Sequence, residues 1–395
     1  MAIDVSAIRD WLVEGGRSSG SPSNMIDTLC RRLTEAGVPL FRVGFFIRTL
    51  HPDFFGRNFI WKPGEAIAMS TVDFDIQESE GFNASPLAIV FREGKEVRSR
   101  PGDPTTRSFP IVEELRAEGV TEYFAIPMLF LDGPAHASSW TTRQEGGFTE
   151  EQVAALRSIM APLARLVEVI QFKRLATMLL DTYVGNRAGE KIMGGQIRRG
   201  HTENLHAAIW LSDLRGFTAL SDRLPAETVV DILNQYFDCQ VAAIKNHGGE
   251  VLKYMGDGLL AVFPIDEYVG DSQQVCARVL EAARETRSGV EAMQYKIGDT
   301  IERFRFGVAL HVGHILYGNI GGGSRLDFTC IGPAVNLAAR LEKLTGKMHR
   351  TIVASEGFAG ICGGGWHDLG EFPIAGFSRA QRVYGMHDEQ VAAVA

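Results

Sequence analysis

The sequence predicts an α+β fold in which two globular regions flank one long helix. The chain of 395 residues is long enough for two or three domains, and a composition of 45% hydrophobic and 22% charged residues is typical of a folded protein. Apolar residues recur at helical spacing in some segments and at strand spacing in others, which indicates mixed secondary structure. The net charge of −8 gives no reason to expect nucleic acid or an anionic membrane as a partner.

The first segment, residues 1–147, mixes helix and strand signals. A helix is expected over 21–36, where apolar residues follow helical spacing up to Gly37, and a short helix over 111–118. Residues 41–50 and 123–131 are rich in β-forming residues and are expected to be strands. This order is similar, on pattern alone, to sensory domains of the GAF or PAS type, so we expect an α+β regulatory domain.

The input to this domain is left open between a small molecule and a protein. His51 and His136 are candidates for haem ligands, although a surface or core position is the more common role of a histidine. A cluster of phenylalanines is interpreted as core and not as a ligand pocket: Phe45, Phe46, Phe54, Phe55 and Phe59.

The second segment, residues 148–203, is expected to be a linker helix followed by a hinge. Thr149 and Gln152 fit a capping box, and about 35 helical residues would extend over about 50 Å. The apolar stripe suits a closing helix of the first domain, a coiled coil with a second copy of the chain, or both in succession. Its members are Val153, Leu156, Met160, Leu163, Val167, Ile170, Leu175 and Met178. The hinge is expected where glycines interrupt the helix, at Gly185, Gly189, Gly194 and Gly195.

The third segment, residues 204–388, has the element order β-α-β-β-α-β of the ferredoxin-like fold. Strands are expected over 207–213, 249–255, 258–263 and 304–312, with a tight Gly-Asp-Gly turn between the second and third. Helices are expected over 226–247, 269–297 and 333–344.

Two carboxylates occupy related positions in this order. Asp213 ends the first strand and Asp257 lies in the hairpin turn, and in the ferredoxin-like order these two places are adjacent. Two carboxylates beside a triphosphate suit Mg²⁺, and Gly216, which precedes a helix, would let backbone N–H groups approach phosphates. Alternatively, Asp213 caps the following helix and Asp257 is only a turn residue. No Walker A motif is present.

Three blocks together resemble class III nucleotidyl cyclases over roughly residues 204–388. They are Asp213-Leu-Arg-Gly-Phe-Thr218, Lys253-Tyr-Met-Gly-Asp257 and the run from Asp327 through Asn336 and Arg340 to Glu342. The resemblance implies that Asp213 and Asp257 hold two divalent cations per site, Mg²⁺ or Mn²⁺, helped by the Leu214 carbonyl. It implies triphosphate binding by the backbone of Gly216, Phe217 and Thr218.

The resemblance also implies a site shared between two protomers. Lys253 and Thr329 would read adenine, Asn336 would orient the ribose, and Arg340 would stabilise charge on the phosphates. Asn336 and Arg340 are four residues apart and therefore share a helix face. Since one chain carries all these groups, a homodimer would contain two complete sites and act as an adenylate cyclase on ATP. The alternatives are a guanylate cyclase, which Lys253 disfavours, and a nucleotide-binding module without turnover.

Two further expectations follow from the resemblance. Thr329 stands where one subgroup, often bicarbonate-responsive, uses Thr to read adenine, which makes bicarbonate sensitivity an expectation; Asp327 is not that reader. Many cyclases place a basic residue near the C-terminus to reach the phosphates, whereas this chain has Ala375 there. Either Arg325, Lys347 or Arg379 takes its place, or the affinity for the phosphates is reduced.

The cellular location is expected to be the cytoplasm. Five scattered cysteines without a C-x-x-C pair suit a reducing compartment, the first residues lack the features of a signal peptide, and no run of about 18 apolar residues is present.

Overall fold

The computed structural model describes residues 3–16, 20–49, 51, 54–131, 133, 135–266, 271–297, 300–323 and 325–389. The chain divides into two compact units, Met1–Met178 and Leu179–Ala395. The division falls inside the long helix α6 (Glu150–Val184), so each unit contains part of the segment predicted to be a separate linker.

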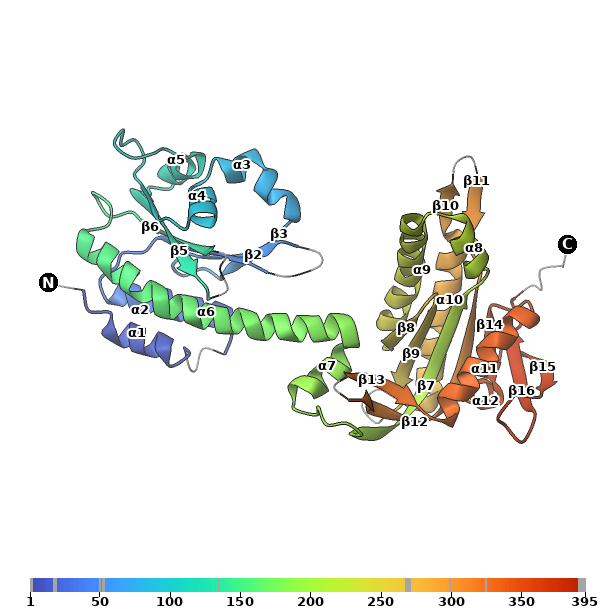
Figure 1. Ribbon diagram of the computed structural model, residues 1–395. Helices are drawn as coiled ribbons and strands as arrows, with labels where there is room; N and C mark the ends of the chain where they lie inside the picture. The colour runs from blue at the N-terminus through green and yellow to red at the C-terminus, as the bar shows by residue number, and fades with distance from the viewer. Residues whose placement is uncertain are drawn as a thin grey trace. The chain divides into compact units, whose positions relative to one another are not determined.

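The first unit is built on a six-stranded antiparallel sheet of order β3-β2-β1-β6-β5-β4 (Figure 1). The strands are β1 (Arg42–Arg48), β2 (Gly56–Trp61), β3 (Ala68–Val72), β4 (Val97–Ser99), β5 (Glu122–Leu129) and β6 (Ala135–Thr142). The two predicted strands correspond to β1 and β5, although Leu50 lies outside the described residues. The strands between them were not predicted. The structure thus confirms an α+β unit, whereas its GAF or PAS type stays a prediction.

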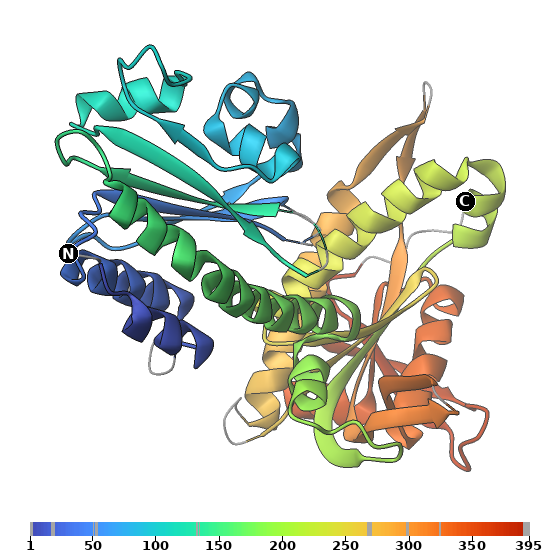
Figure 2. The ribbon, with the colours of Figure 1, turned by 60° about the vertical axis from the view of Figure 1, so that its left-hand side comes forward.

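Helices cover both faces of this sheet. On one face lie α1 (Ser6–Val13), α2 (Pro22–Glu35) and the first part of α6, side by side (Figure 2). The other face carries α4 (Pro86–Glu93) and α5 (Pro110–Ala117), near η1 (Phe74–Glu78) and α3 (Glu80–Asn83). Strand alternation explains the division, because Phe45 of β1 enters the core with α2 and α6 while Phe46 faces the opposite side.

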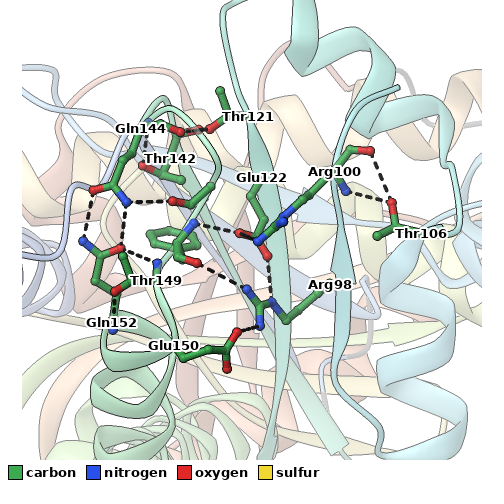
Figure 3. A network of polar contacts seen from close by, with 12 residues as sticks. Arg98, Arg100, Thr106, Thr121, Glu122, Thr142, Gln144, Thr149, Glu150 and Gln152 are labelled. Atoms are coloured by element: carbon green, nitrogen blue, oxygen red, sulfur yellow. Dashed lines mark hydrogen bonds and ion pairs between the residues drawn. The ribbon is translucent and has the colours of Figure 1, made fainter. Parts of the chain in front are cut away.

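The start of α6 is fixed by polar contacts to the sheet (Figure 3). Its predicted capping box is confirmed, since the Gln152 N–H donates to Thr149 Oγ1 at 3.2 Å and the Thr149 N–H donates to Gln152 Oε1 at 2.9 Å. Nearby, the buried Glu122 carboxylate accepts from Arg98 Nε and from the Phe148 N–H, each at 2.7 Å. Arg98 also donates to Glu150 at 2.6 Å, so strands β4 and β5 and the helix start share one network.

The apolar stripe predicted along α6 divides into two parts. Its first part is buried in the core of the first unit, from Val153 to Val167. In the second part, Leu175 and Met178 are half-buried, and different residues are exposed: Val169, Phe172, Leu179 and Tyr183. The exposed apolar face of α6, which could pair with a second copy of the helix, therefore differs from the face predicted from the sequence.

After α6 the chain forms a second helix and not an open glycine-rich segment. Gly185 ends α6 with a φ of +86°, and α7 (Asn186–Met193) follows at once. Ala188 and Gly189 of α7 are buried in the second unit, so the predicted hinge region is largely a packed helix.

The second unit contains an eight-stranded sheet, with path β15-β16-β14-β12-β7-β9-β8 and β13 paired to β12. Its strands are β7 (Thr202–Leu214), β8 (Glu250–Met255), β9 (Gly258–Pro264), β12 (Phe306–Gly322), β13 (Arg325–Ile331), β14 (Ile352–Ser355), β15 (Trp366–Phe372) and β16 (Gln381–Met386). The central order β12-β7-β9-β8 is the ferredoxin-like arrangement predicted from the sequence.

The helices of this unit also lie on two faces. A core on one face contains α9 (Ala226–Asn246), α10 (Ser272–Ala292) and α12 (Glu356–Cys362), and the other face carries α7 and α11 (Pro333–Lys347). The helix predicted over 269–297 is shorter: residue 269 lies outside the described ranges, and after α10 the chain turns into the hairpin of β10 (Gln294–Ile297) and β11 (Thr300–Arg303). Within the described ranges, no helix combines the length and apolar character that a bilayer crossing requires.

Candidate active site

Asp213 and Asp257 lie together at one end of the central strands. Asp213 of β7 is opposite Gly258 of β9, and Asp257 occupies the turn that joins β8 to β9. Burial raises the pKa of Asp213 to about 7, and the neighbouring carboxyls of Asp257 and Glu342 add to this effect. The structure thus brings two acidic groups into hydrogen-bonding reach of each other where little positive charge offsets them.

Glu342 is a third acid near this pair, to which the sequence reasoning gave no role. It lies on α11, its pKa is raised by burial, and Arg215 acts in the opposite direction. Glu342 stands at the end of the third motif block, two residues after Arg340, so its position in the motif was the signal that could have identified it.

The turn after Asp213 leaves backbone N–H groups at the edge of the site. Gly216 has a φ of +72°, a left-handed conformation that suits glycine, and it caps α8 (Phe217–Arg223). Gly216 and Thr218 are exposed, while Leu214 is buried. Because the first N–H groups of a helix have no partner within that helix, this turn presents donors to an anion.

Lys253, Asp327 and Thr329 form a second cluster in this unit. Lys253 of β8 makes an ion pair with Asp327 of β13, and both side chains are about half exposed. Thr329 lies two residues after Asp327, so both residues face the same side of β13. The predicted adenine-reading residues therefore share a neighbourhood, and Asp327 is an addition that the structure supplies.

Asn336 and Arg340 lie one turn apart on α11, and both are exposed. Among the described residues, neither side chain forms a hydrogen bond or ion pair with Asp213 or Asp257. Ala375 is exposed in the turn after β15, outside any strand, and so does not occupy the strand position expected of a phosphate-binding residue.

The carboxyl pair fits a divalent cation. Two hard oxygen donors are close together, and a cation would relieve the repulsion that raises the pKa of Asp213. The described residues contain no group of three or more His, Cys, Asp or Glu side chains with metal-site geometry. The remaining ligands would then be the Leu214 carbonyl, water and substrate phosphates, as is common for Mg²⁺.

Comparisons with known proteins find similarity to nucleotide cyclases in the second unit. Residues 201–359 match the model of the adenylate and guanylate cyclase catalytic domain. An adenylate cyclase of Anabaena cylindrica is 32% identical over 212 residues, covering 52% of this chain and 41% of the relative. An adenylate cyclase of Dictyostelium discoideum, described as terminal-differentiation specific, is 29% identical over 153 residues, covering 38% of this chain and 7% of the relative.

Among solved structures, adenylyl cyclase CyaB of P. aeruginosa is 26% identical with a TM-score of 0.42, covering 48% of this chain and 97% of that one. The chain spans less than half the length of the two adenylate cyclases described above. The second unit therefore contains a segment, residues 201–359, that matches the adenylate and guanylate cyclase catalytic domain and has adenylate cyclases among its relatives.

Proposed function

We propose that the chain is an adenylate cyclase that converts ATP to 3′,5′-cyclic AMP and pyrophosphate. The observation that carries the proposal is the pair of neighbouring carboxyls, Asp213 and Asp257, beside the exposed turn at Gly216, within a segment that matches a cyclase catalytic domain. These groups suit the binding of a nucleoside triphosphate with divalent cations.

In this proposal, each cluster has a distinct task. The N–H groups from Gly216 to Thr218 bind the triphosphate, and Lys253 with Thr329 holds the adenine edge. Asn336 orients the ribose. The Arg340 guanidinium stabilises negative charge that accumulates when the 3′-oxygen attacks the α-phosphorus. When bound, two divalent cations, Mg²⁺ or Mn²⁺, neutralise phosphate charge and favour the 3′-oxygen as nucleophile.

The proposed site is completed by a second copy of the chain. Asn336 and Arg340 are exposed and, among the described residues of one protomer, form no ion pair or hydrogen bond with the carboxyl pair, which supports a homodimer in which each protomer supplies part of each site. The first unit, a sheet with helices on both faces, is proposed to be a sensory domain acting through α6. Its GAF type, its input and any bicarbonate sensitivity of the catalytic unit belong to this proposal.

A cyclase assay with ATP and with GTP tests the activity. We expect cyclic AMP from ATP at a rate at least about tenfold above the rate with GTP, because discrimination by buried hydrogen bonds is large. A higher rate with GTP would make the chain a guanylate cyclase, and nucleotide binding without turnover of either substrate would make it a binding module.

Mixing two inactive variants tests the shared site. Asp213→Asn and Arg340→Ala should each lose at least about 99% of activity, as expected for groups that hold cations or stabilise the transition state. A heterodimer of the two has one site in which both residues are intact, so mixing should restore up to about half the activity per heterodimer. If subunit exchange is verified and no activity returns, the site is not shared.

A further inference from the structure

A cavity of about 300 Å³ opens on the sheet face opposite α6 in the first unit. It lies between β1, β2 and β5 of the sheet and α3, α4 and α5. Its walls are largely apolar and aromatic, including Phe46, Phe55, Phe82, Leu87, Phe91 and Ile111. Its size is at the lower end of the range for small-molecule pockets.

This cavity divides the phenylalanine cluster that the sequence interpreted as core. Phe45 and Phe59 are core residues with 3% exposure, whereas Phe46 and Phe55 line the cavity. Neither His51 nor His136 lines it, and His136 Nδ1 accepts the Arg48 N–H at 3.1 Å. The structure therefore gives the expectation of a haem ligand no support at this cavity.

Arg48 places a cation in this apolar surrounding. Its guanidinium carbon lies 4.8 Å from the Phe91 ring centroid and 5.2 Å from that of Phe55, within the range of cation–π contacts. Its Nε is buried without a hydrogen-bond partner, and burial lowers its pKa. An arginine nevertheless stays charged, so this N–H is a donor without an acceptor.

No acid among the described residues that line the cavity neutralises this charge. Arg42 and Arg48 are both lining residues, and the polar remainder consists of Asn58, Ser85 and Tyr123, without Asp or Glu. Arg42 also lies near Glu118, whereas Arg48 forms no ion pair with a described residue. The ligand that complements the cavity has an apolar body and one anionic group.

We propose that this cavity binds a small amphipathic carboxylic acid, with the carboxylate on Arg48 and an aromatic or short aliphatic body between Phe46, Phe55 and Phe91. A carboxylate is planar and matches the two-pronged geometry of a guanidinium, and it would supply the negative charge that no lining residue offers to Arg48. The inference assigns a class of ligand to the first unit and rests on the proposal that this unit is sensory. Binding of the ligand to the cavity is measured without any assay of cyclase activity.

Ligand-observed NMR on the full-length chain tests the proposal, with phenylacetate as probe and neutral phenylacetamide as its matched control. Phenylacetate should bind, and phenylacetamide should bind at least about tenfold more weakly, because a charge-assisted hydrogen bond is about twice as strong as a neutral one. Ile76→Trp, which adds bulk to the lining, should abolish binding of both compounds.

Three arginine variants make the test specific. Arg48→Met should weaken phenylacetate binding about tenfold or more, and Arg48→Lys, which keeps the charge but not the fork, should weaken it less. Arg57→Met is the control, since Arg57 pairs with Ile47, the residue before Arg48, but does not line the cavity. The affinity of this variant for phenylacetate should stay within about twofold of the parent value.

Several outcomes would overturn the proposal. They are absence of phenylacetate binding to the parent chain up to about 5 mM, equal affinity for the acid and the amide, and an equal loss in Arg57→Met and Arg48→Met. Binding of cyclic AMP at this cavity, with no binding of the acid, would assign the site to a nucleotide instead.

Discussion

Two neighbouring polar residues of β13, Asp327 and Thr329, differ in the role we assign to them. Asp327 pairs with Lys253 on the surface, where an ion pair contributes about 0–1 kcal/mol to stability. Thr329, on the same side of the strand, is less exposed. If Thr329 accepts a hydrogen bond from the adenine amino group, its loss would leave a polar group of the substrate unpaired.

Thr329→Val should therefore lower kcat/KM for ATP at least about tenfold, since the loss of a buried hydrogen bond to substrate is costly. Asp327→Asn, the matched change on the same strand face, should alter kcat/KM less than about threefold. Steady-state kinetics with ATP and GTP checks both. A larger effect of Asp327→Asn would identify Asp327 as the base-reading residue.

At the same scale, the sequence could predict contacts that short spacing determines or, as for Asp213 and Asp257, contacts that follow from the element order of a known fold. The Thr149–Gln152 capping box was predictable because its partners are three residues apart. Arg98 and Glu122, which are 24 residues apart, were not, because their contact depends on the register between β4 and β5. The unpaired Arg48 likewise becomes visible only when β1, β2, β5 and the helices α3, α4 and α5 enclose the cavity beside it.

At the scale of elements, the network around Glu122 fastens the start of α6 to two strands of the first unit (Figure 3). The Glu122 side chain is 1% exposed and receives a third, longer contact of 3.5 Å from Arg100. A buried carboxylate of this kind is stable only while its donors remain, because desolvation of an unpaired charge is expensive.

Glu122→Gln should lower the free energy of unfolding of the first unit by about 3 kcal/mol, because Arg98 then loses its buried counter-ion. Glu150→Gln is the control, since the Glu150 side chain is 77% exposed, and it should lower the free energy of unfolding much less than Glu122→Gln does. Urea denaturation followed by tryptophan fluorescence reports the change, because Trp140 lies fully buried in this unit. Equal effects of the two variants would contradict a special role of the buried carboxylate.

The second part of α6 presents an exposed apolar face. Val169, Phe172, Ala176, Leu179 and Tyr183 are three and four residues apart in turn, the spacing of a coiled-coil seam. Phe172 is 72% exposed and Tyr183 is 80% exposed, which is unusual for such large side chains along one stripe.

Phe172→Glu combined with Leu179→Glu should shift the chain from dimer toward monomer, since two like charges would face their copies across a parallel seam. The matched control, Gln171→Glu with Thr177→Glu, adds the same charge outside the stripe and should leave the mass unchanged. Light scattering coupled to size exclusion measures the mass. A dimer that persists in the first variant would mean that α6 does not supply the contact.

At the scale of the whole molecule, the boundary of the catalytic unit lies earlier than the sequence suggested. Helix α7 packs into the core beside β7 and β12, and the segment after it is tied to β12. Asn319 donates to the Gln196 carbonyl at 2.7 Å, and the Gly200 N–H donates to the Asn319 carbonyl at 2.9 Å. Glycines suggested a hinge here because sequence alone does not show that Gly189 lies within a helix, α7, that packs on the sheet.

A fragment that begins at Leu179 should therefore be more stable than one that begins at Asn204. Truncation at Asn204 removes the buried Ala188, the partly buried Val184 and Ile192, and the hydrogen bonds to Asn319, so the melting temperature of the shorter fragment should be about 10 °C lower. Thermal unfolding of the two fragments, each ending at residue 389, measures the difference. Equal melting temperatures would show that α7 does not contribute to the stability of the second unit.

The broad architecture was predictable, because element order fixes the central sheet of the second unit. The strands β14 to β16 and the hairpin of β10 and β11 were not predicted, because short strands carry weak periodicity. In the first unit, two of the six strands were identified. The others are short or interrupted by polar residues, and their pairing depends on contacts distant in sequence.

The joint at Gly185 has a consequence for how such chains can be recombined. A side chain there would bring its Cβ within 2.9 Å of Glu250 Oε1, and Glu250, which accepts the Arg187 N–H at 3.0 Å, begins the strand that leads to Lys253 and the Asp257 turn. The end of α6 therefore packs against the first residue of β8 in the sheet of the second unit. Any other input domain that ends in a helix could be joined upstream of Gly185, and the contact of Gly185 with Glu250 would be kept. A splice downstream of Gly185 would remove the contact between Gly185 and Glu250. Exchange of domains between proteins is therefore expected to keep Gly185 and to vary the sequence before it.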